Sequence, residues 1–215
     1  MGRLYKDVSR WIFTGAFALF LVIVVFAPQV MSVFGARFSD GVTALLIVAV
    51  AQLYSSSVGP APRMLAMTGN QNFAMIATSV AAVTGVVVSL ILIPPYEILG
   101  AAIGMATAII TENTGTMAAV KWRLGFWPFN LAWLKPLAAG AVAATVTYLL
   151  GLVVTLPGGP IPNVVVFGGF LGVVLLALLF LFGLSETDKE FLRAFWNVAK
   201  RYLPRRFRGG GMGRG

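Results

Sequence analysis

Apolar and polar positions alternate along the chain in long blocks, and the apolar blocks define the elements that we expect. Each block is about as long as a helix that crosses the hydrocarbon core, which takes about 20 residues. The segments between the blocks, such as PPYE and PGGPIP, are dense in Gly, Pro, Asn or charged residues, which is typical of turns. The pattern predicts an all-α, polytopic membrane protein with six transmembrane helices. The blocks contain no lysine or arginine and lie at residues 11–27, 42–58, 73–93, 99–119, 136–156 and 163–183.

The chain changes character after the last apolar block. Thr187 and Glu190 have capping-box spacing, and apolar residues recur on one helical face behind them. We expect residues 1–184 to form the transmembrane domain, residues 185–204 an amphipathic helix in the cytoplasmic headgroup layer, and residues 205–215 a disordered basic tail. Anionic lipids are the expected partners of this region. Its predicted membrane-surface residues are Lys200, Arg201, Arg205, Arg206 and Arg208.

Composition supports the membrane assignment and removes several kinds of chemistry. Hydrophobic residues make up 59% of the chain and charged residues only 11%, with a mean hydropathy of +0.89, whereas about a quarter of the residues in a soluble domain are charged. The absence of cysteine and histidine excludes disulfides, thiol nucleophiles, imidazole catalysis and Cys or His metal sites. We therefore expect no cofactor and no metal. No pair of acidic residues suggests acid–base work, so an enzyme is not predicted.

The distribution of basic residues predicts the topology. The net charge is +9, and in the six-helix arrangement every basic residue except Arg37 falls on one side of the membrane. The positive-inside rule makes that side the cytoplasm, with both termini there, in a multi-pass protein of the plasma membrane. The basic start also has the form of a secretory signal, but its apolar run is longer than a signal core, so a retained helix is predicted. An Arg-Gly tail can bind RNA, but lipid and topology account for the same charges, so nucleic acid is not an expected partner.

A glutamate, Glu112, lies inside the fourth apolar block. On a helical wheel it projects from the flank of a stripe of small residues that allows another helix to approach closely. A carboxylate in hydrocarbon costs about 2.5–3.5 kcal/mol on insertion scales, so it should face protein or a water-filled cavity. It serves either as a structural hydrogen bond to a Ser or Thr of a neighbouring helix or as part of a substrate or proton path. The small stripe is Gly100, Gly104, Ala108, Gly115 and Ala119, and the opposite, lipid-suited face is Leu99, Ile103, Ile110 and Met117.

Further polar residues complete the candidate substrate pathway, which consists of Glu112, Asn113, Gln52 and Ser55. Asn113 is expected closer to the lipid face, in a packing role. Gln52, Tyr54 and the serines 55–57 crowd the cytoplasmic end of the second block. They either coat a cavity wall or mark the membrane interface, and the second interpretation is favoured because polar residues near helix ends cost little.

Three stretches carry a resemblance to a known family: FGARFSDG, GPAPRMLAMTGNQNF and LILIPPYEILGAAIGMATAI. Together they resemble the carboxyl-terminal part of oligosaccharide-lipid flippases, polysaccharide biosynthesis proteins of the multidrug/oligosaccharidyl-lipid/polysaccharide exporter superfamily. Asn113, followed by a basic segment and the pair Pro128 and Phe129, also fits. The resemblance covers nearly the whole chain but departs at Glu97, where the family usually has glycine.

The resemblance implies a function and a missing partner. Family members have two helical lobes around a central cavity and move a polyprenyl-linked oligosaccharide between leaflets by alternating access. This chain resembles only the last six helices, so the expectation is a partial or split flippase that needs an amino-terminal half or an oligomer. The alternatives are a cation-coupled multidrug exporter of the same superfamily, which a lone intramembrane acid would suit, and a non-transporting scaffold of polysaccharide assembly.

Overall fold

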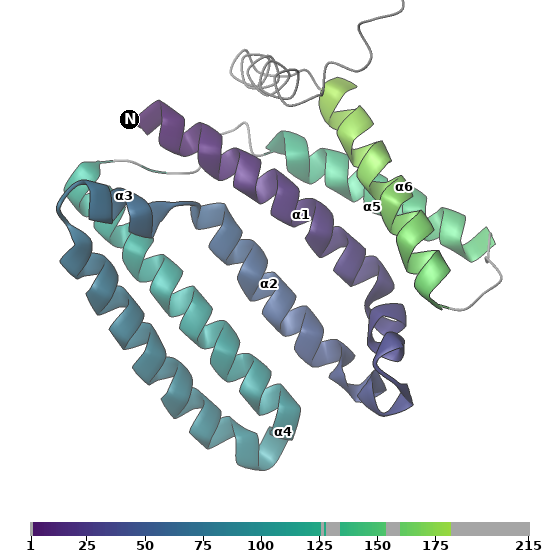
Figure 1. Ribbon diagram of the computed structural model, residues 1–215, viewed down its shortest axis with the longest axis horizontal. Coiled ribbons are helices and arrows are strands. Elements are labelled where there is room, and N and C mark those ends of the chain that lie inside the picture. Colours follow the sequence, from purple (N-terminus) through teal and green to yellow (C-terminus); the bar gives the residue numbers. More distant parts are fainter. Residues whose placement is uncertain (1, 126, 128–133, 154–159, 182–215) are drawn as a thin grey trace, which may run out of the picture.

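The computed structural model describes residues 2–125, 127, 134–153 and 160–181 (Figure 1). Within these ranges every regular element is a helix, so the all-α fold class is confirmed for the described part of the chain. The segment 185–215, with the predicted interfacial helix, the tail and their five surface-binding basic residues, lies outside the described residues. The elements are α1 (Gly2–Val33), the 3-10 helix η1 (Ala36–Gly41), α2 (Val42–Val58), α3 (Ala61–Met67), α4 (Gln71–Leu124), α5 (Leu134–Val153) and α6 (Pro160–Leu181).

Two of the predicted helices form a single hairpin. α4 has 54 residues and folds back on itself at Glu97, whose φ of 47° and ψ of −117° break the helix directly after Pro94 and Pro95 (Figure 1). Proline lacks the amide hydrogen that an interior helix position needs, so the bend falls where the sequence cannot continue a straight helix. We call residues 71–96 the first arm and residues 98–124 the second arm.

Length and composition make this a membrane protein. Among the described residues, three helices are long and apolar enough to cross a membrane: Val8–Val33, Val42–Met67 and Gln71–Leu124. Each arm of the hairpin is about 40 Å long at the helical rise, more than the hydrocarbon core of about 30 Å. α5 and α6 contain shorter apolar segments, Pro136–Gly151 and Val164–Leu175. Six crossings and cytoplasmic termini stay predictions.

The helices lie side by side in a row rather than in a closed bundle. The α4 hairpin packs on α2, α2 packs on α1, and α1 packs on α5 and α6, which also pack on each other (Figure 1). This arrangement leaves large apolar side chains uncovered, such as Leu90, which is 69% exposed. Such a surface is suited to lipid or to another protein and not to water.

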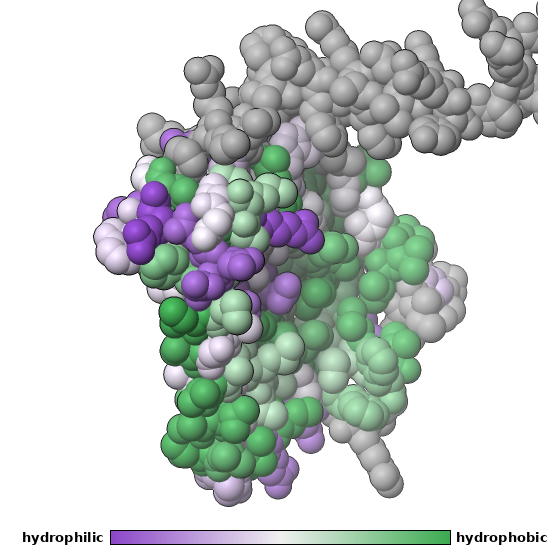
Figure 2. All heavy atoms as spheres, turned by 60° about the vertical axis from the view of Figure 1, so that its left-hand side comes forward, coloured by the Kyte–Doolittle hydropathy of each residue, from purple (hydrophilic) through white to green (hydrophobic). Residues whose placement is uncertain are grey.

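One end of the row gathers basic residues. A core cluster of Tyr5, Val58, Leu65 and Val120 with two alanines joins the start of α1, the end of α2, α3 and the end of α4. We call this the basic end, because Lys6, Arg10, Arg63, Lys121 and Arg123 belong to these segments. Figure 2 shows hydrophilic residues over the upper part of the hairpin side of the molecule and mainly hydrophobic residues below them. Asp40 in η1 and Glu97 at the bend lie away from the basic end, near the start of α2.

Tyr5 holds α1 to α2 at the basic end. Its Oη donates a hydrogen bond to the Val58 carbonyl oxygen at 2.8 Å, and burial raises the pKa of the phenol to about 12. Tyr5→Phe is expected to lower the free energy of unfolding in micelles by about 1 kcal/mol, because the buried carbonyl loses its donor.

The same tyrosine gives a pH signature. Unfolded tyrosine loses its proton near pH 10, below the folded pKa of about 12. Its contribution to stability is therefore complete below about pH 10 and is lost as the pH rises towards 12. The free energy of unfolding, measured in steps from about pH 8 to about pH 12, should fall in the wild type across the interval between these two pKa values. It should fall less in Tyr5→Phe. Parallel curves would contradict the assignment.

Candidate functional site

The small-residue stripe of the second arm packs against the first arm, as the wheel predicted. A Cβ added at Gly85 would lie 2.7 Å from the Ala108 Cβ, and one added at Gly115 would lie 3.0 Å from the Ala77 Cβ. The Cβ of Ser89 lies 2.9 Å from the corresponding position at Gly104. The two arms approach this closely only because glycine and alanine line the contact.

Glu112 binds across this contact. Thr78 Oγ1, on the first arm, donates a hydrogen bond to Glu112 Oε1 at 2.9 Å. The structure therefore contains the structural bond to a neighbouring threonine that the sequence offered as one interpretation. Glu112 is only half-buried, and no hydrogen bond to its Oε2 is found within the described ranges. A role of this carboxyl group in transport stays a prediction.

The position that the helical wheel predicted for Asn113 is wrong. It was expected closer to the lipid face, but it is 8% exposed and lies between the second arm and α2. Ser55 Oγ donates to Asn113 Oδ1 at 3.3 Å, and Asn113 Nδ2 donates to the Ile109 carbonyl oxygen at 2.8 Å. The wheel gave the second arm one packed face, whereas a helix inside a row has a neighbour on two sides. Met117, placed with the lipid-suited residues, likewise packs against the core cluster of the basic end.

A polar seam extends from this position. Tyr54 Oη and Thr114 Oγ1 lie 2.9 Å apart, so α2 and the second arm share a second side-chain hydrogen bond beside that of Ser55 and Asn113. Buried Thr116 donates to the carbonyl oxygens of Glu112 and Asn113. Sequence reasoning missed Thr78 and Thr114 as partners. The sequence feature that could have identified them is a threonine within a membrane-spanning stretch, because such hydroxyl groups often form hydrogen bonds to a neighbouring helix.

The four candidate residues therefore separate into three environments. Ser55 and Asn113 contact each other, and Glu112 turns to the other side of the second arm to reach Thr78. Gln52 is exposed, and its carbonyl oxygen accepts a hydrogen bond from Ser56 Oγ at 2.9 Å. The structure does not bring Gln52 to Glu112.

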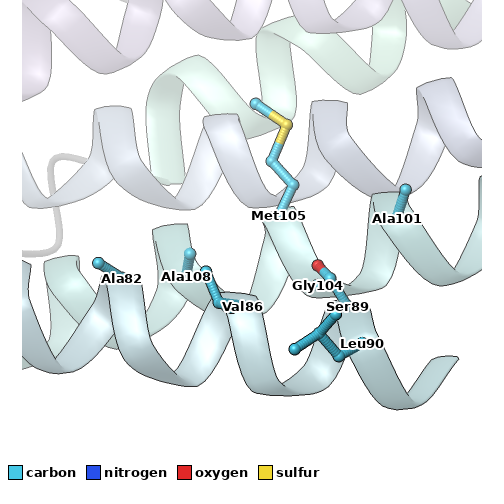
Figure 3. A pocket seen from close by; sticks show the side chains of 9 residues that line it. Ala82, Val86, Ser89, Leu90, Ala101, Gly104, Met105 and Ala108 are labelled. Atoms are coloured by element: carbon cyan, nitrogen blue, oxygen red, sulfur yellow. The ribbon is translucent and has the colours of Figure 1, made fainter. Parts of the chain in front are cut away.

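An apolar groove runs along the hairpin next to Glu112. Its volume is about 310 Å³, and both arms line it, with Ala82 and Ser89 on one side and Gly104, Met105 and Ala108 on the other (Figure 3). Thr78 and Glu112 lie one helical turn beyond Ala82 and Ala108, on the side of the basic end. Their hydrogen bond therefore lies between the groove and the basic end. The groove can hold an alkyl chain or an apolar side chain. Within the described residues, no group of three or more His, Cys, Asp or Glu is placed to hold a metal.

Removing the Ser55 hydroxyl should have a small and specific effect. Ser55→Ala is expected to lower the free energy of unfolding by about 0.6 kcal/mol, the average for an interhelical hydrogen bond in a membrane protein. Asn113→Ala should cost more, about 1–3 kcal/mol, because the buried amide also fills space and binds the Ile109 carbonyl. Denaturant unfolding in micelles measures both. An Asn113→Ala protein as stable as Ser55→Ala would contradict the buried position of the amide.

No family model matches this sequence, and no curated protein or solved structure matches it. The relation to oligosaccharide-lipid flippases therefore stays a prediction from the three quoted stretches.

Proposed function

We propose that this chain is one half of a translocator that moves a lipid-linked oligosaccharide across the plasma membrane for cell-surface polysaccharide or glycan biosynthesis. The observation that carries the proposal is Glu112, a half-buried carboxyl group in a membrane-spanning hairpin, one helical turn beyond a residue that lines an apolar groove. A lipid-linked sugar needs both an apolar path for its chain and polar groups for its head. The resemblance of the three quoted stretches to flippases supports the same substrate class.

The open row of helices supports a half rather than a whole transporter. Apolar side chains stay exposed along the hairpin, and the six apolar blocks of the sequence contain no lysine or arginine that could face Glu112. A cation for this carboxylate would have to come from outside these six blocks. We propose that this is the amino-terminal half or an oligomeric partner, with the basic end and both termini in the cytoplasm.

Reconstitution tests this function. The full chain is placed in proteoliposomes with a fluorescent polyprenyl-diphosphate oligosaccharide, alone and together with the protein that co-purifies with it from membranes of its source. Dithionite bleaches only label that reaches the outer leaflet, so flipping increases the bleached fraction. We expect flipping with the partner and none with this chain alone. Flipping at full rate by this chain alone would contradict the half-transporter, and no flipping with the partner would favour the scaffold.

A cation-coupled multidrug exporter is the second candidate, and Glu112 is the observation that favours it. A single carboxyl group in an apolar span can bind and release a proton during transport. The same proteoliposomes distinguish the two. A drug exporter should move a drug when a proton gradient is imposed, and it should not increase the fraction of labelled oligosaccharide that dithionite bleaches.

A further inference from the structure

The basic end of the α4 hairpin holds cations against aromatic rings. The Arg123 guanidinium carbon lies 4.6 Å from the ring centroid of Phe73 and 4.6 Å from that of Trp122. The two rings meet edge to face at 5.9 Å. On the other side of the helix end, Lys121 Nζ lies 4.8 Å from the ring centroid of Trp127. We call these five residues the cation–aromatic end.

Both cations of this end lie at the surface of the described part of the chain. Neither Lys121 nor Arg123 forms an ion pair within the part of the chain that the structure describes, and both are exposed. Asp40 and Glu97 belong to the opposite end, and Glu112 precedes Arg123 by about 16 Å of helix. The aromatic contacts fix the direction of the guanidinium without neutralising its charge.

The surroundings of the cations select a lipid rather than a soluble anion. Trp122 is 72% exposed, and tryptophan prefers the headgroup level of a membrane. Ile76 lies one turn further along the first arm than Phe73 and is 59% exposed. A ligand at Arg123 therefore meets a positive charge at its head and apolar surface beneath it.

From this arrangement we infer that the cation–aromatic end binds the phosphate of an anionic membrane lipid, with Arg123 as the main contact and Trp122 as its positioning residue. Lys121, on the opposite side of the helix, adds a second positive charge at the same end of the hairpin. The site shares no residue with the groove, and it does not depend on the transport proposal.

Lipid titration of the full chain tests this inference. Native mass spectrometry in micelles counts individual bound phosphatidylglycerol or phosphatidylcholine molecules and gives a Kd for each. We expect phosphatidylglycerol to bind more tightly. Arg123→Gln should weaken its binding about fivefold, and Lys121→Gln with Arg123→Gln about 25-fold, because each charge near the surface contributes about 1 kcal/mol.

Two variants separate a built site from general charge. Trp122→Leu keeps every charge but releases Arg123, and it should weaken phosphatidylglycerol binding about two- to fivefold. Arg63→Gln removes another exposed charge of the basic end, one without a ring contact, and it should weaken binding less than Arg123→Gln does. Equal losses from Arg63→Gln and Arg123→Gln, or wild-type binding by Trp122→Leu, would overturn the inference.

Inorganic phosphate provides the last comparison. If it displaces phosphatidylglycerol at concentrations near the lipid's own Kd, the site binds free phosphate and the lipid assignment is wrong. Failure of phosphate to compete, together with tighter binding of the anionic lipid, supports the headgroup site.

Discussion

Replacing Gly100 with alanine should force the two arms of the α4 hairpin apart near their bend and lower the free energy of unfolding by about 2–3 kcal/mol. A Cβ at this position would fall on the Leu92 carbonyl group and lie 2.6 Å from the Ile93 nitrogen. These are backbone atoms of the first arm, so no side-chain rotation relieves the overlap. Thermal or denaturant unfolding in micelles measures the effect.

Gly169→Ala is the matched control for this substitution. Gly169 is also a helical glycine, in α6, but a Cβ added there meets nothing within 4 Å. Alanine has the higher helix propensity, so this variant should be as stable as the wild type or more stable by up to about 1 kcal/mol. Equal stabilities of Gly100→Ala and Gly169→Ala would show that the arms are not in close contact near the bend.

Glu112→Gln should reduce flipping in the reconstituted complex at least tenfold while leaving the fold intact. The glutamine carbonyl oxygen can still accept the hydrogen bond from Thr78, so the contact between the arms is kept. Only the ionisable group is lost, and a tenfold change in rate corresponds to about 1.4 kcal/mol in the barrier. The measurement is the rate of dithionite bleaching over a range of pH.

Thr78→Val provides the complementary control. It removes the hydroxyl that binds Glu112 but keeps the carboxyl group, so it should cost about 0.6 kcal/mol of stability and change flipping less than threefold. The pair of variants separates the two interpretations of Glu112. A wild-type rate for Glu112→Gln at every pH would mean that this residue has only the structural role.

Local patterns were sufficient to predict the helices. The described part of each of the six apolar blocks falls in a helix, and the block 42–58 has the bounds of α2, because apolar length and flanking turn residues act within one segment. The contact between the arms was also foreseeable in part. A stripe of glycine and alanine has little use except close approach, and Gly104 and Gly115 do lie against the first arm.

The pairing of helices could not be predicted in the same way. A wheel shows which residues share a face but not how many neighbours a helix has, and this is why the buried position of Asn113 was missed. The bond between Thr78 and Glu112 joins two arms whose separation depends on the bend at Glu97. α3 was expected as part of a loop, because seven residues carry too little periodicity to identify a helix.

The central place of α1 sets an order of assembly during synthesis. The hairpin arms and α2 follow one another in the chain, so their contacts can form as soon as each segment leaves the ribosome. α1 is made before the other described helices, yet one of its sides packs on α6, where Phe26 stacks on Phe167 with ring centroids 6.3 Å apart. That side of α1 stays unpaired until α5 and α6 have been translated. A nascent chain that stops after the hairpin therefore carries a finished α2–α4 unit and a first helix that is still open to chaperones and proteases.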